Sequence, residues 1–421
     1  MFDRLLTSGY FPRELPPTFS SVAYGQQVAS TLPSLPTASV RPHRSALLSP
    51  HSLPRSGLLR RELGLVSPIQ FSALCVELTS EWQNINQLIK RSPWSRSRPI
   101  FHTRGARSFL PLSVRQRSLI GPRATLRAGS RYIVQTDISR FYHSIYTHSV
   151  PWVMHTKSVA KRQRNNSALA GNRIDLALRS TSDGQTMGIP VGPDTSLIIA
   201  ELILSEIDTI LHAKEPSLKG LRYIDDYEFA VDSHDAAENA IGSLQELLSD
   251  VELGLNVEKT GVSELPMPFE YVWASELRAL PVRRTGQASD LIRLFDRAFG
   301  FAKQYPTHPI LRYLMGQLKG FRALPGNWKL YQDLLLQCIT VEPGTIASVV
   351  SNLMAHVQTG FQVDRQMIEP ALNEAIERHS RFAHGNEIAW TLWALMTLGF
   401  RLSNESLTAL AGCGKSSISH S

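Results

Sequence analysis

Three aspartates supply the most distinctive chemistry in this sequence. Asp225 and Asp226 are adjacent and lie between strand-forming residues, which predicts a hairpin with an acidic tip. Asp137 lies near the end of another predicted strand, at 132–138. Neighbouring carboxylates repel one another unless a cation lies between them, and hard oxygen ligands of this kind suit Mg²⁺.

If the three carboxylates converge, they can hold a pair of ions. Such a pair stabilises the attacking and the leaving oxygen of an in-line phosphoryl transfer. Taken alone, an adjacent pair of aspartates is also typical of a solvated turn. The third carboxylate, on a separate strand, favours the catalytic interpretation.

Length and composition predict a soluble globular protein with two or three domains, since the chain has 421 residues, 43% hydrophobic and 19% charged. Its three cysteines are widely spaced and form no metal or disulfide pattern, which favours a reducing, cytoplasmic location. The N-terminal segment does not resemble a secretory signal. The most apolar stretch, 388–400, is too short to span a bilayer, so we expect a buried helix there and no membrane association.

Positive charge is concentrated in one part of the chain. Between Arg41 and Arg131 there are 16 Lys or Arg and three acids, a net charge of +13, which leaves −5 for the rest of a chain whose total is +8. A polyanion is expected to lie across such a segment. Arginine outnumbers lysine, which favours bidentate phosphate contacts, and interspersed aromatic rings could stack on bases. A solvated basic surface is the alternative.

Changes in composition divide the chain into four predicted parts. Residues 1–58 are rich in Pro, Ser and Thr and predict an extended or loosely folded arm. Residues 59–130 form the basic region, with one helix at 68–90. Residues 131–285 alternate strands and helices, and 286–421 are helical. The fold class is therefore α+β.

Helical periodicity locates most of the remaining elements. Helices are predicted at 196–211, with Asp194, Thr195 and Ser196 as N-cap candidates, and at 234–251, followed by a strand at 255–257. The last part predicts an α-solenoid-like stack of helices joined by short turns. Its predicted helices are 289–304, 308–321, 327–340, 344–357, 364–380, 385–399 and 403–411.

In chain order, four segments resemble the palm motifs of reverse transcriptases: 137–142, 185–196, 223–226 and 254–259. The resemblance implies that Asp137, Asp225, Asp226 and the backbone carbonyl of Ile138 hold two Mg²⁺ ions, with Mn²⁺ as a possible substitute. It also implies that the ring of Tyr142 excludes a ribose 2′-hydroxyl.

The same resemblance implies further contacts to the nucleotide and the nucleic acid. Val191 and Gly192 belong to the second motif, and Lys259 lies near the pyrophosphate leaving group as a candidate general acid. Retroviral and retron relatives usually have Gln where this chain has Val191. The arginines selected to grip triphosphate or template are Arg60, Arg61, Arg104 and Arg107.

Segments 9–17, 144–152, 189–193 and 384–390 resemble a narrower lineage, the bacterial defence-associated and abortive-infection ("unknown group") reverse transcriptases. This resemblance implies right-hand polymerase fingers and palm, with a fingers insertion at about 152–185. It also implies an all-α helical-repeat C-terminal domain in place of a thumb.

The function implied is RNA-directed DNA synthesis from dNTPs in antiphage defence, with an RNA template, in some relatives a non-coding RNA, and a DNA product. Some relatives form homo-oligomers. Others extend DNA without a template, and some prime on a protein hydroxyl. A template-independent polymerase and an inactive nucleic-acid-binding scaffold are the alternatives. His384 and Glu387 have helical metal spacing but no third ligand evident in the sequence, so a structural cap or core hydrogen bond is favoured over a metal site.

Overall fold

The computed structural model describes residues 1–31, 44–56, 59–113, 119–283 and 287–413. The chain divides into two compact units. One, here called the sheet unit, comprises Met1–Arg13, Ser20–Pro50 and Gly64–Phe269. The other, the helical unit, comprises Glu14–Phe19, His51–Leu63 and Glu270–Ser421.

The sheet unit is built on a four-stranded antiparallel sheet. Its strand order is β6 (Lys219–Tyr223), β7 (Asp226–Val231), β5 (Tyr132–Asp137) and β8 (Gly261–Glu264). The predicted strand at 132–138 and the predicted hairpin around Asp225 are thus present. β5 pairs along its whole length with β7 on one side, as far as Asp137, and through Tyr132–Gln135 with β8 on the other.

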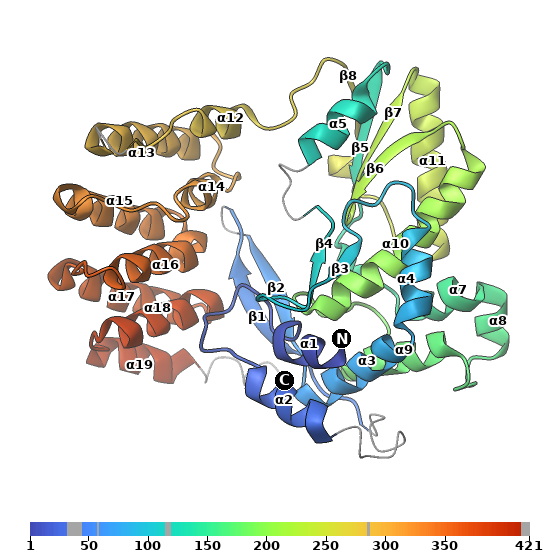
Figure 1. Cartoon of the computed structure of the whole chain (residues 1–421), viewed down its shortest axis with the longest axis horizontal. Helices are drawn as coiled ribbons and strands as arrows, with labels where there is room; N and C mark the ends of the chain where they lie inside the picture. Colours follow the sequence, from blue (N-terminus) through green and yellow to red (C-terminus); the bar gives the residue numbers. More distant parts are fainter. Residues whose placement is uncertain (32–43, 57–58, 114–118, 284–286, 414–421) are drawn as a thin grey trace. The chain divides into compact units, whose positions relative to one another are not determined.

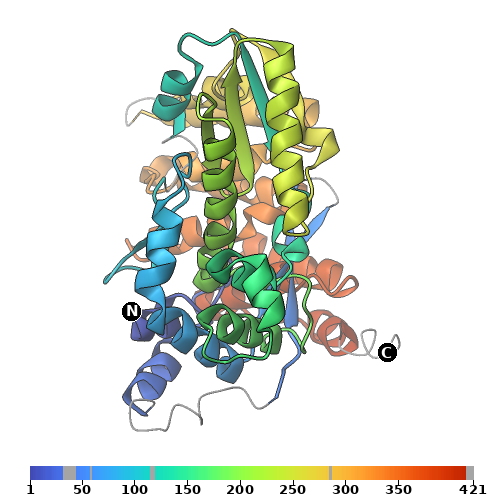
Figure 2. The ribbon, with the colours of Figure 1, turned by 90° about the vertical axis from the view of Figure 1, so that its right-hand side faces the viewer.

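Alternating apolar residues bury both faces of this sheet. Val134 and Phe229 enter the main core, to which α10 (Asp194–Lys214) and α11 (His234–Asp250) contribute. Ile133 and Ala230 point the other way, toward Leu126 of α5 (Ile120–Arg127). Figure 2 shows α10 and α11 running beside the strands.

The rest of the sheet unit is mainly helical, with one small hairpin. Its elements are α1 (Phe2–Ser8), α2 (Val22–Thr31), α3 (Pro68–Ser80), α4 (Trp82–Lys90), β3 (Pro99–Phe101), β4 (Phe109–Pro111), α6 (Phe141–Ser144), α7 (Ser149–His155), α8 (Lys157–Arg162) and α9 (Ala170–Ser180).

Two of these elements differ from the sequence expectation. The region expected to be a loose arm contains α1, whose Leu5 and Leu6 are fully buried in the main core. The single helix expected at 68–90 is interrupted at Glu81, whose backbone leaves helical geometry. The two halves then pack against different partners, α3 against α9 and α4 against α10.

A third difference lies next to the site. The predicted strand at 255–257 is replaced by an isolated bridge between Leu255 and Ile138 and a 3₁₀ turn, η4 (Val257–Lys259). The backbone N–H of Asn256 donates to the carbonyl of Asp137 at 2.8 Å, so this turn is tied to the end of β5. This tight turn directs the side chain of Lys259 back toward Asp137 at the end of the sheet. A strand that continued straight through 257–259 would carry Lys259 away from it.

The helical unit contains every helix predicted between 289 and 411, with ends shifted by a few residues. Figure 1 shows them stacked in successive tiers. Proline and glycine separate several of them, and Gly399 ends α18 with a positive φ of 67°. The helices are α12 (Val272–Arg278), α13 (Gln287–Gln304), α14 (Ile310–Gln317), α15 (Trp328–Val341), α16 (Ile346–Val357), α17 (Arg365–Ser380), α18 (Gly385–Leu398) and α19 (Asn404–Cys413).

Two N-terminal segments, residues 14–19 and 51–63, belong to this helical unit. The predicted domain boundaries at 58 and 285 assign these segments to other domains. Strands β1 (Ser49–Pro54) and β2 (Arg60–Leu65) form a two-stranded sheet. Arg60 of β2 makes a bidentate ion pair with the fully buried Glu387 of α18, at 2.8 and 2.7 Å. The indole N–H of Trp390 donates to the carbonyl of Glu14 at 2.7 Å. Within the described ranges, no helix combines the length and apolarity needed to cross a bilayer.

Candidate catalytic site of the sheet unit

The strand register brings the predicted carboxylates together. Asp137 and Asp226 are directly opposite each other, as the last pair of the β5–β7 ladder. Cα atoms of opposite residues in antiparallel strands lie about 4.5–5.5 Å apart. Asp225 belongs to the two-residue loop that joins β6 to β7, immediately before Asp226. All three carboxylates therefore lie at one end of the sheet.

Their mutual repulsion appears in the pKa of Asp226. Burial of its carboxyl group, followed by the charges of Asp225 and Asp137, raises this pKa to about 7. The nearby positive charges of Lys259 and Arg123 oppose the shift but do not cancel it. A site with this imbalance favours a bound cation.

Lys259 makes direct contact with the site. Its Nζ donates to Oδ2 of Asp137, and the side chain is otherwise largely exposed. This hydrogen bond is the main cause that raises the pKa of Lys259; burial opposes it, and the charges of the three aspartates add to it. The ammonium thus marks a position where the protein stabilises positive charge.

The residues present fit divalent metal ions. Asp137 is only 5% exposed, and its Oδ1 is buried without a hydrogen-bond partner among the described residues. A buried carboxylate oxygen of this kind needs a positive partner. Three carboxylates provide the hard oxygen donors that Mg²⁺ prefers. Ile138, whose carbonyl is the fourth proposed donor, is buried and held in its bridge to Leu255.

The second palm-like segment lies against α6, which carries Tyr142. The N–H of Ile189 donates to the carbonyl of Tyr142 at 2.8 Å. Gly192 has a φ of +129°, and a Cβ there would lie 2.4 Å from Pro12 Cγ, so only glycine fits. Val191 beside it is 7% exposed, so its side chain is mostly core. The structure places these residues together but does not assign their roles.

Asp194, one of the predicted N-cap residues, uses its side chain for contacts outside its own helix. α10 begins at Asp194 without a side-chain cap; instead, Asp194 accepts hydrogen bonds from the N–H groups of Ser108 (3.0 Å) and Phe109 (2.9 Å). Arg107 pairs with the same carboxylate and also donates to the carbonyl of Gly192 at 2.9 Å. Arg107 therefore ties β4 to the glycine loop.

The four arginines selected from the sequence thus fall into two groups. Arg60 and Arg107 are committed to Glu387 and Asp194, contrary to the expectation that their guanidinium groups face nucleic acid. Arg61 and Arg104 are exposed.

Two arginines that sequence reasoning did not select lie beside the catalytic hairpin. The N–H of Arg96 donates to the carbonyl of Arg222 in β6 at 2.7 Å, and Arg98 follows two residues later. The Nε atoms of Arg96 and Arg98 are both buried without a hydrogen-bond partner among the described residues. Their i, i+2 spacing in an extended segment was the available signal, because it places both on one face.

The helical unit contains a second cluster of possible metal ligands, and two of its three members are recognised from the sequence. His379 supplies the third group missing beside His384 and Glu387, and ligand atoms of the three lie within 4.8 Å of one another. Arg60, however, occupies both carboxylate oxygens, and the two imidazole Nδ1 atoms are 3.0 Å apart, at hydrogen-bond distance. Burial lowers the pKa of both histidines, which suits a neutral hydrogen-bonded pair. These contacts account for the cluster without a metal ion.

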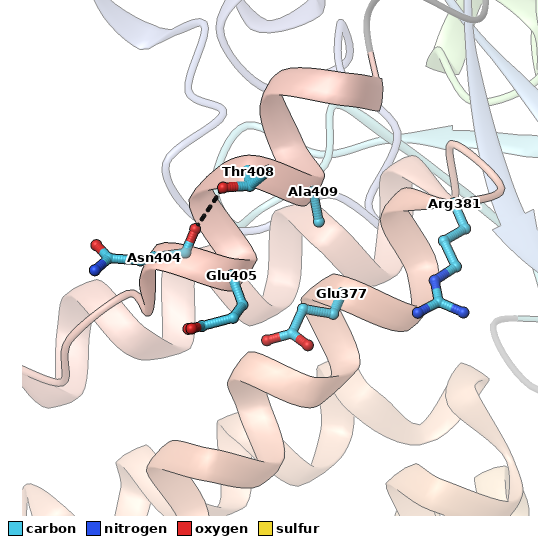
Figure 3. A pocket seen from close by; sticks show the side chains of 6 residues that line it. All are labelled: Glu377, Arg381, Asn404, Glu405, Thr408 and Ala409. Carbon is cyan, nitrogen blue, oxygen red and sulfur yellow. Dashed lines mark hydrogen bonds between the residues drawn. The ribbon is translucent and has the colours of Figure 1, made fainter.

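The helical unit also has a surface pocket. Figure 3 shows its lining on α17 and α19, where Thr408 Oγ1 donates to the carbonyl of Asn404 at 2.8 Å. Its lining side chains are Glu377, Arg381, Asn404, Glu405, Thr408 and Ala409. The three aspartates belong to the other unit, so this pocket is not the site described here.

The sheet and the carboxylates at its end are those expected of a nucleotidyltransferase. Residues 81–283 match the family described as "Reverse transcriptase (RNA-dependent DNA polymerase)". Residues 81–283 therefore form a reverse transcriptase domain, which indicates an RNA-directed DNA polymerase, as the sequence predicted. The match covers the family as a whole and does not single out the defence-associated lineage.

The solved structures that match this chain include telomerases from two Candida species. Telomerase from Candida albicans with a fragment of telomeric RNA is 11% identical over 88% of this chain and 68% of that one, with a TM-score of 0.34. Telomerase from Candida tropicalis is 12% identical, both without RNA (95% and 71% covered, TM-score 0.37) and with an RNA fragment (94% and 68%, TM-score 0.33). With TM-scores below 0.5, these similarities support no further conclusion. No curated protein matches the chain in sequence.

Proposed function

We propose that this protein copies RNA into DNA in antiphage defence, by two-metal nucleotidyl transfer at Asp137, Asp225 and Asp226. The observation that carries the catalytic part is the direct opposition of Asp137 and Asp226, with Asp225 in the adjoining loop. The defence role rests on the lineage resemblance of the sequence, as do a cytoplasmic location, a partner non-coding RNA and a homo-oligomeric state.

In this proposal the aspartates bind two Mg²⁺ ions, which would activate the attacking hydroxyl and neutralise charge on the leaving pyrophosphate. Asp137 and Asp225 would be the main ligands of the ions and Asp226 a partial one, and the Ile138 carbonyl would add a neutral donor. The hydroxyl belongs to a primer 3′ end or, in protein priming, to a Ser, Thr or Tyr. Lys259, close to all three carboxylates, is placed to donate a proton to the leaving group.

Residues around the aspartates would bind the dNTP and the nucleic acid. Tyr142, whose carbonyl accepts from the N–H of Ile189, would exclude a 2′-hydroxyl. The Nε atoms of Arg96 and Arg98 are buried without a hydrogen-bond partner among the described residues, and the backbone of Arg96 bonds to β6. These two arginines are therefore better candidates for the triphosphate than Arg60 or Arg107. Arg61 and Arg104 remain candidates for template or primer phosphates.

Template-independent DNA synthesis is the second candidate, because a buried Val191 stands where templated relatives usually have Gln. The test is to purify the chain, supply dNTPs and Mg²⁺, and sequence the DNA product with any copurifying nucleic acid. A product complementary to a bound RNA supports templated copying, whereas homopolymeric or random DNA supports the second candidate. Absence of incorporation by the wild-type chain on any primer would leave the inactive scaffold.

A further inference from the structure

We propose that Ser97 and Arg222 form a clamp that holds Ile224 in a left-handed conformation and thereby positions Asp225 and Asp226. This inference rests on the proposed two-metal function and names positioning residues for it. None of the three is among the proposed metal ligands.

The loop that carries the acidic pair has an unfavourable backbone. Tyr223 and Asp226 pair across it, which leaves Ile224 and Asp225 as a two-residue connection. Of these two, only Ile224 has a positive φ, +57°. In hairpins, a positive φ at the first loop residue alone is typical of a type II′ turn, where glycine is preferred. A β-branched side chain is disfavoured in this region.

Both backbone groups of this residue are held by buried side chains. The N–H of Ile224 donates to Ser97 Oγ at 2.6 Å, and its carbonyl accepts from Arg222 Nη1 at 2.9 Å. Ser97 and Arg222 are both fully buried. The N–H and the carbonyl of Ile224 belong to the two peptide groups on either side of its Cα, so the two contacts together restrain φ and ψ of this residue, which a single contact would not.

A charge network supports the clamp from α10. Arg222 pairs with Glu201 at 2.7 Å and with Asp208 at 2.8 Å, and all three side chains are fully buried. Burial acts to lower the pKa of Arg222, but the charges of Asp208 and Glu201 outweigh it and keep that pKa raised. Ser97 Oγ donates to Glu201 Oε1 at 2.6 Å, so the same carboxylate orients both arms of the clamp.

The chain contains a matched control for this contact. Ser95 Oγ donates to the other oxygen of Glu201, also at 2.6 Å, and accepts from the backbone N–H of Ser97 at 3.3 Å. Ser95→Ala and Ser97→Ala therefore each remove one hydrogen bond to the same buried carboxylate and one hydrogen bond accepted from a backbone N–H. Only Ser97→Ala removes the bond to Ile224.

Four full-length variants test the clamp: Ser95→Ala, Ser97→Ala, Ile224→Gly and the double variant Ser97→Ala with Ile224→Gly. Measurements are kcat, KM for dNTP, the Mg²⁺ concentration that gives half-maximal rate, and Tm with and without Mg²⁺. We expect Ser97→Ala to lower kcat about tenfold, the effect of about one hydrogen bond, and to raise the Mg²⁺ requirement. Ser95→Ala should stay within about twofold of wild type on both.

Ile224→Gly distinguishes positioning from general support of the fold. Glycine adopts a positive φ without strain, so the loop should then need the clamp less. In that background Ser97→Ala should lower kcat less than about threefold. Equal losses for Ser95→Ala and Ser97→Ala, or a Ser97→Ala loss undiminished by glycine at 224, would overturn the clamp.

Failure of the proposed polymerase function can be distinguished from failure of the clamp. A wild-type chain that incorporates no dNTP would refute the polymerase, and the clamp would then be judged on Mg²⁺ binding alone. In that measurement, Mg²⁺ should raise the Tm of Ser95→Ala at the wild-type concentration and that of Ser97→Ala only at a higher one. Identical Mg²⁺ titrations of the two variants would refute the clamp.

Discussion

Asp137 and Asp226 form the final pair of the β5–β7 ladder, so their carboxylates are fixed by backbone pairing rather than by side-chain packing. Asp137 is paired with β7 on one side, and on the other its carbonyl accepts from the N–H of Asn256 at 2.8 Å, which limits how far Asp137 can move away. Two like charges are thus held together by the hydrogen bonds of the sheet. The repulsion can be relieved by a cation or a proton, and both routes lead to experiments.

Removing one carboxylate should abolish catalysis and spare the fold. For Asp225→Ala we expect DNA synthesis to fall at least about a thousandfold, because a lost ligand costs several kcal/mol of transition-state stabilisation. The side chain lies in a loop and repels its neighbours, so Tm without metal should be unchanged or slightly higher. Labelled dNTP incorporation and thermal unfolding measure the two effects. Unchanged incorporation would refute the assignment of Asp225.

The raised pKa of Asp226 predicts a pH-dependent stability of the metal-free protein. The folded carboxyl keeps its proton up to about pH 7, whereas an unfolded aspartate releases it near about pH 4. The folded state therefore binds more protons over this interval, and its stability falls as the pH rises from about 4 to about 7. Asp226→Asn removes this loss. The variant should be more stable than wild type at pH 8, and the difference should shrink toward pH 4.

The same proton should compete with Mg²⁺. Below about pH 7, the Mg²⁺ concentration needed for half-maximal thermal stabilisation should rise, by up to about tenfold per pH unit, because Asp226 must lose its proton to bind metal. Titrations at pH 6, 7 and 8 measure this shift. A Mg²⁺ requirement that is flat across the three pH values would contradict the prediction.

Lys259 should act as a competing cation when no metal is bound. Lys259→Met removes the charge that contacts Asp137, so it should lower the Mg²⁺ concentration for half-maximal stabilisation, by up to about fivefold for so exposed an ion pair. Lys259→Arg keeps the charge and serves as the control. If Lys259 also donates a proton during transfer, kcat of the Met variant falls even at saturating Mg²⁺.

Arg107 and Arg104 should separate structural from nucleic-acid roles. Arg107→Ala leaves the buried Asp194 without its ion pair and should cost about 3 kcal/mol of stability. Arg104→Ala changes an exposed side chain, so Tm should stay constant while binding to a primer–template weakens and its salt dependence is reduced. Thermal unfolding and salt-dependent binding of a labelled duplex test the pair. If Arg104→Ala lowered the Tm and Arg107→Ala did not, the structural and nucleic-acid-binding roles assigned to the two arginines would be reversed.

Sequence reasoning located the carboxylates because their signal is local. An acidic pair between β-branched and aromatic residues predicts a hairpin, and periodicity ends a strand near Asp137. The partners of Arg60 and Arg107 lie 327 and 87 residues away, so no local pattern could show that these guanidinium groups were already occupied.

The backbone conformation of Ile224 could not be predicted from the sequence either. A β-branched residue beside tyrosine predicts extended backbone, whereas the structure gives a positive φ that glycine would normally supply. Glu201 and Asp208 did carry a signal. They are seven residues apart on one face of a largely apolar helix, and charges in such positions are stable only when paired. Their partner, a buried arginine in a strand, is what the pattern did not identify.

The contacts of Arg60 with Glu387 and of Trp390 with Glu14 impose an order on biosynthesis. Residues 14–19 and 51–63 leave the ribosome well before helix α18, since Arg60 and Glu387 are 327 residues apart. A nascent or prematurely terminated chain therefore presents an incomplete strand pair and an uncompensated Arg60, the kind of surface on which unfinished chains aggregate. The helical unit is closed by segments that are far apart along the chain, so it cannot mature until α18 has been synthesised.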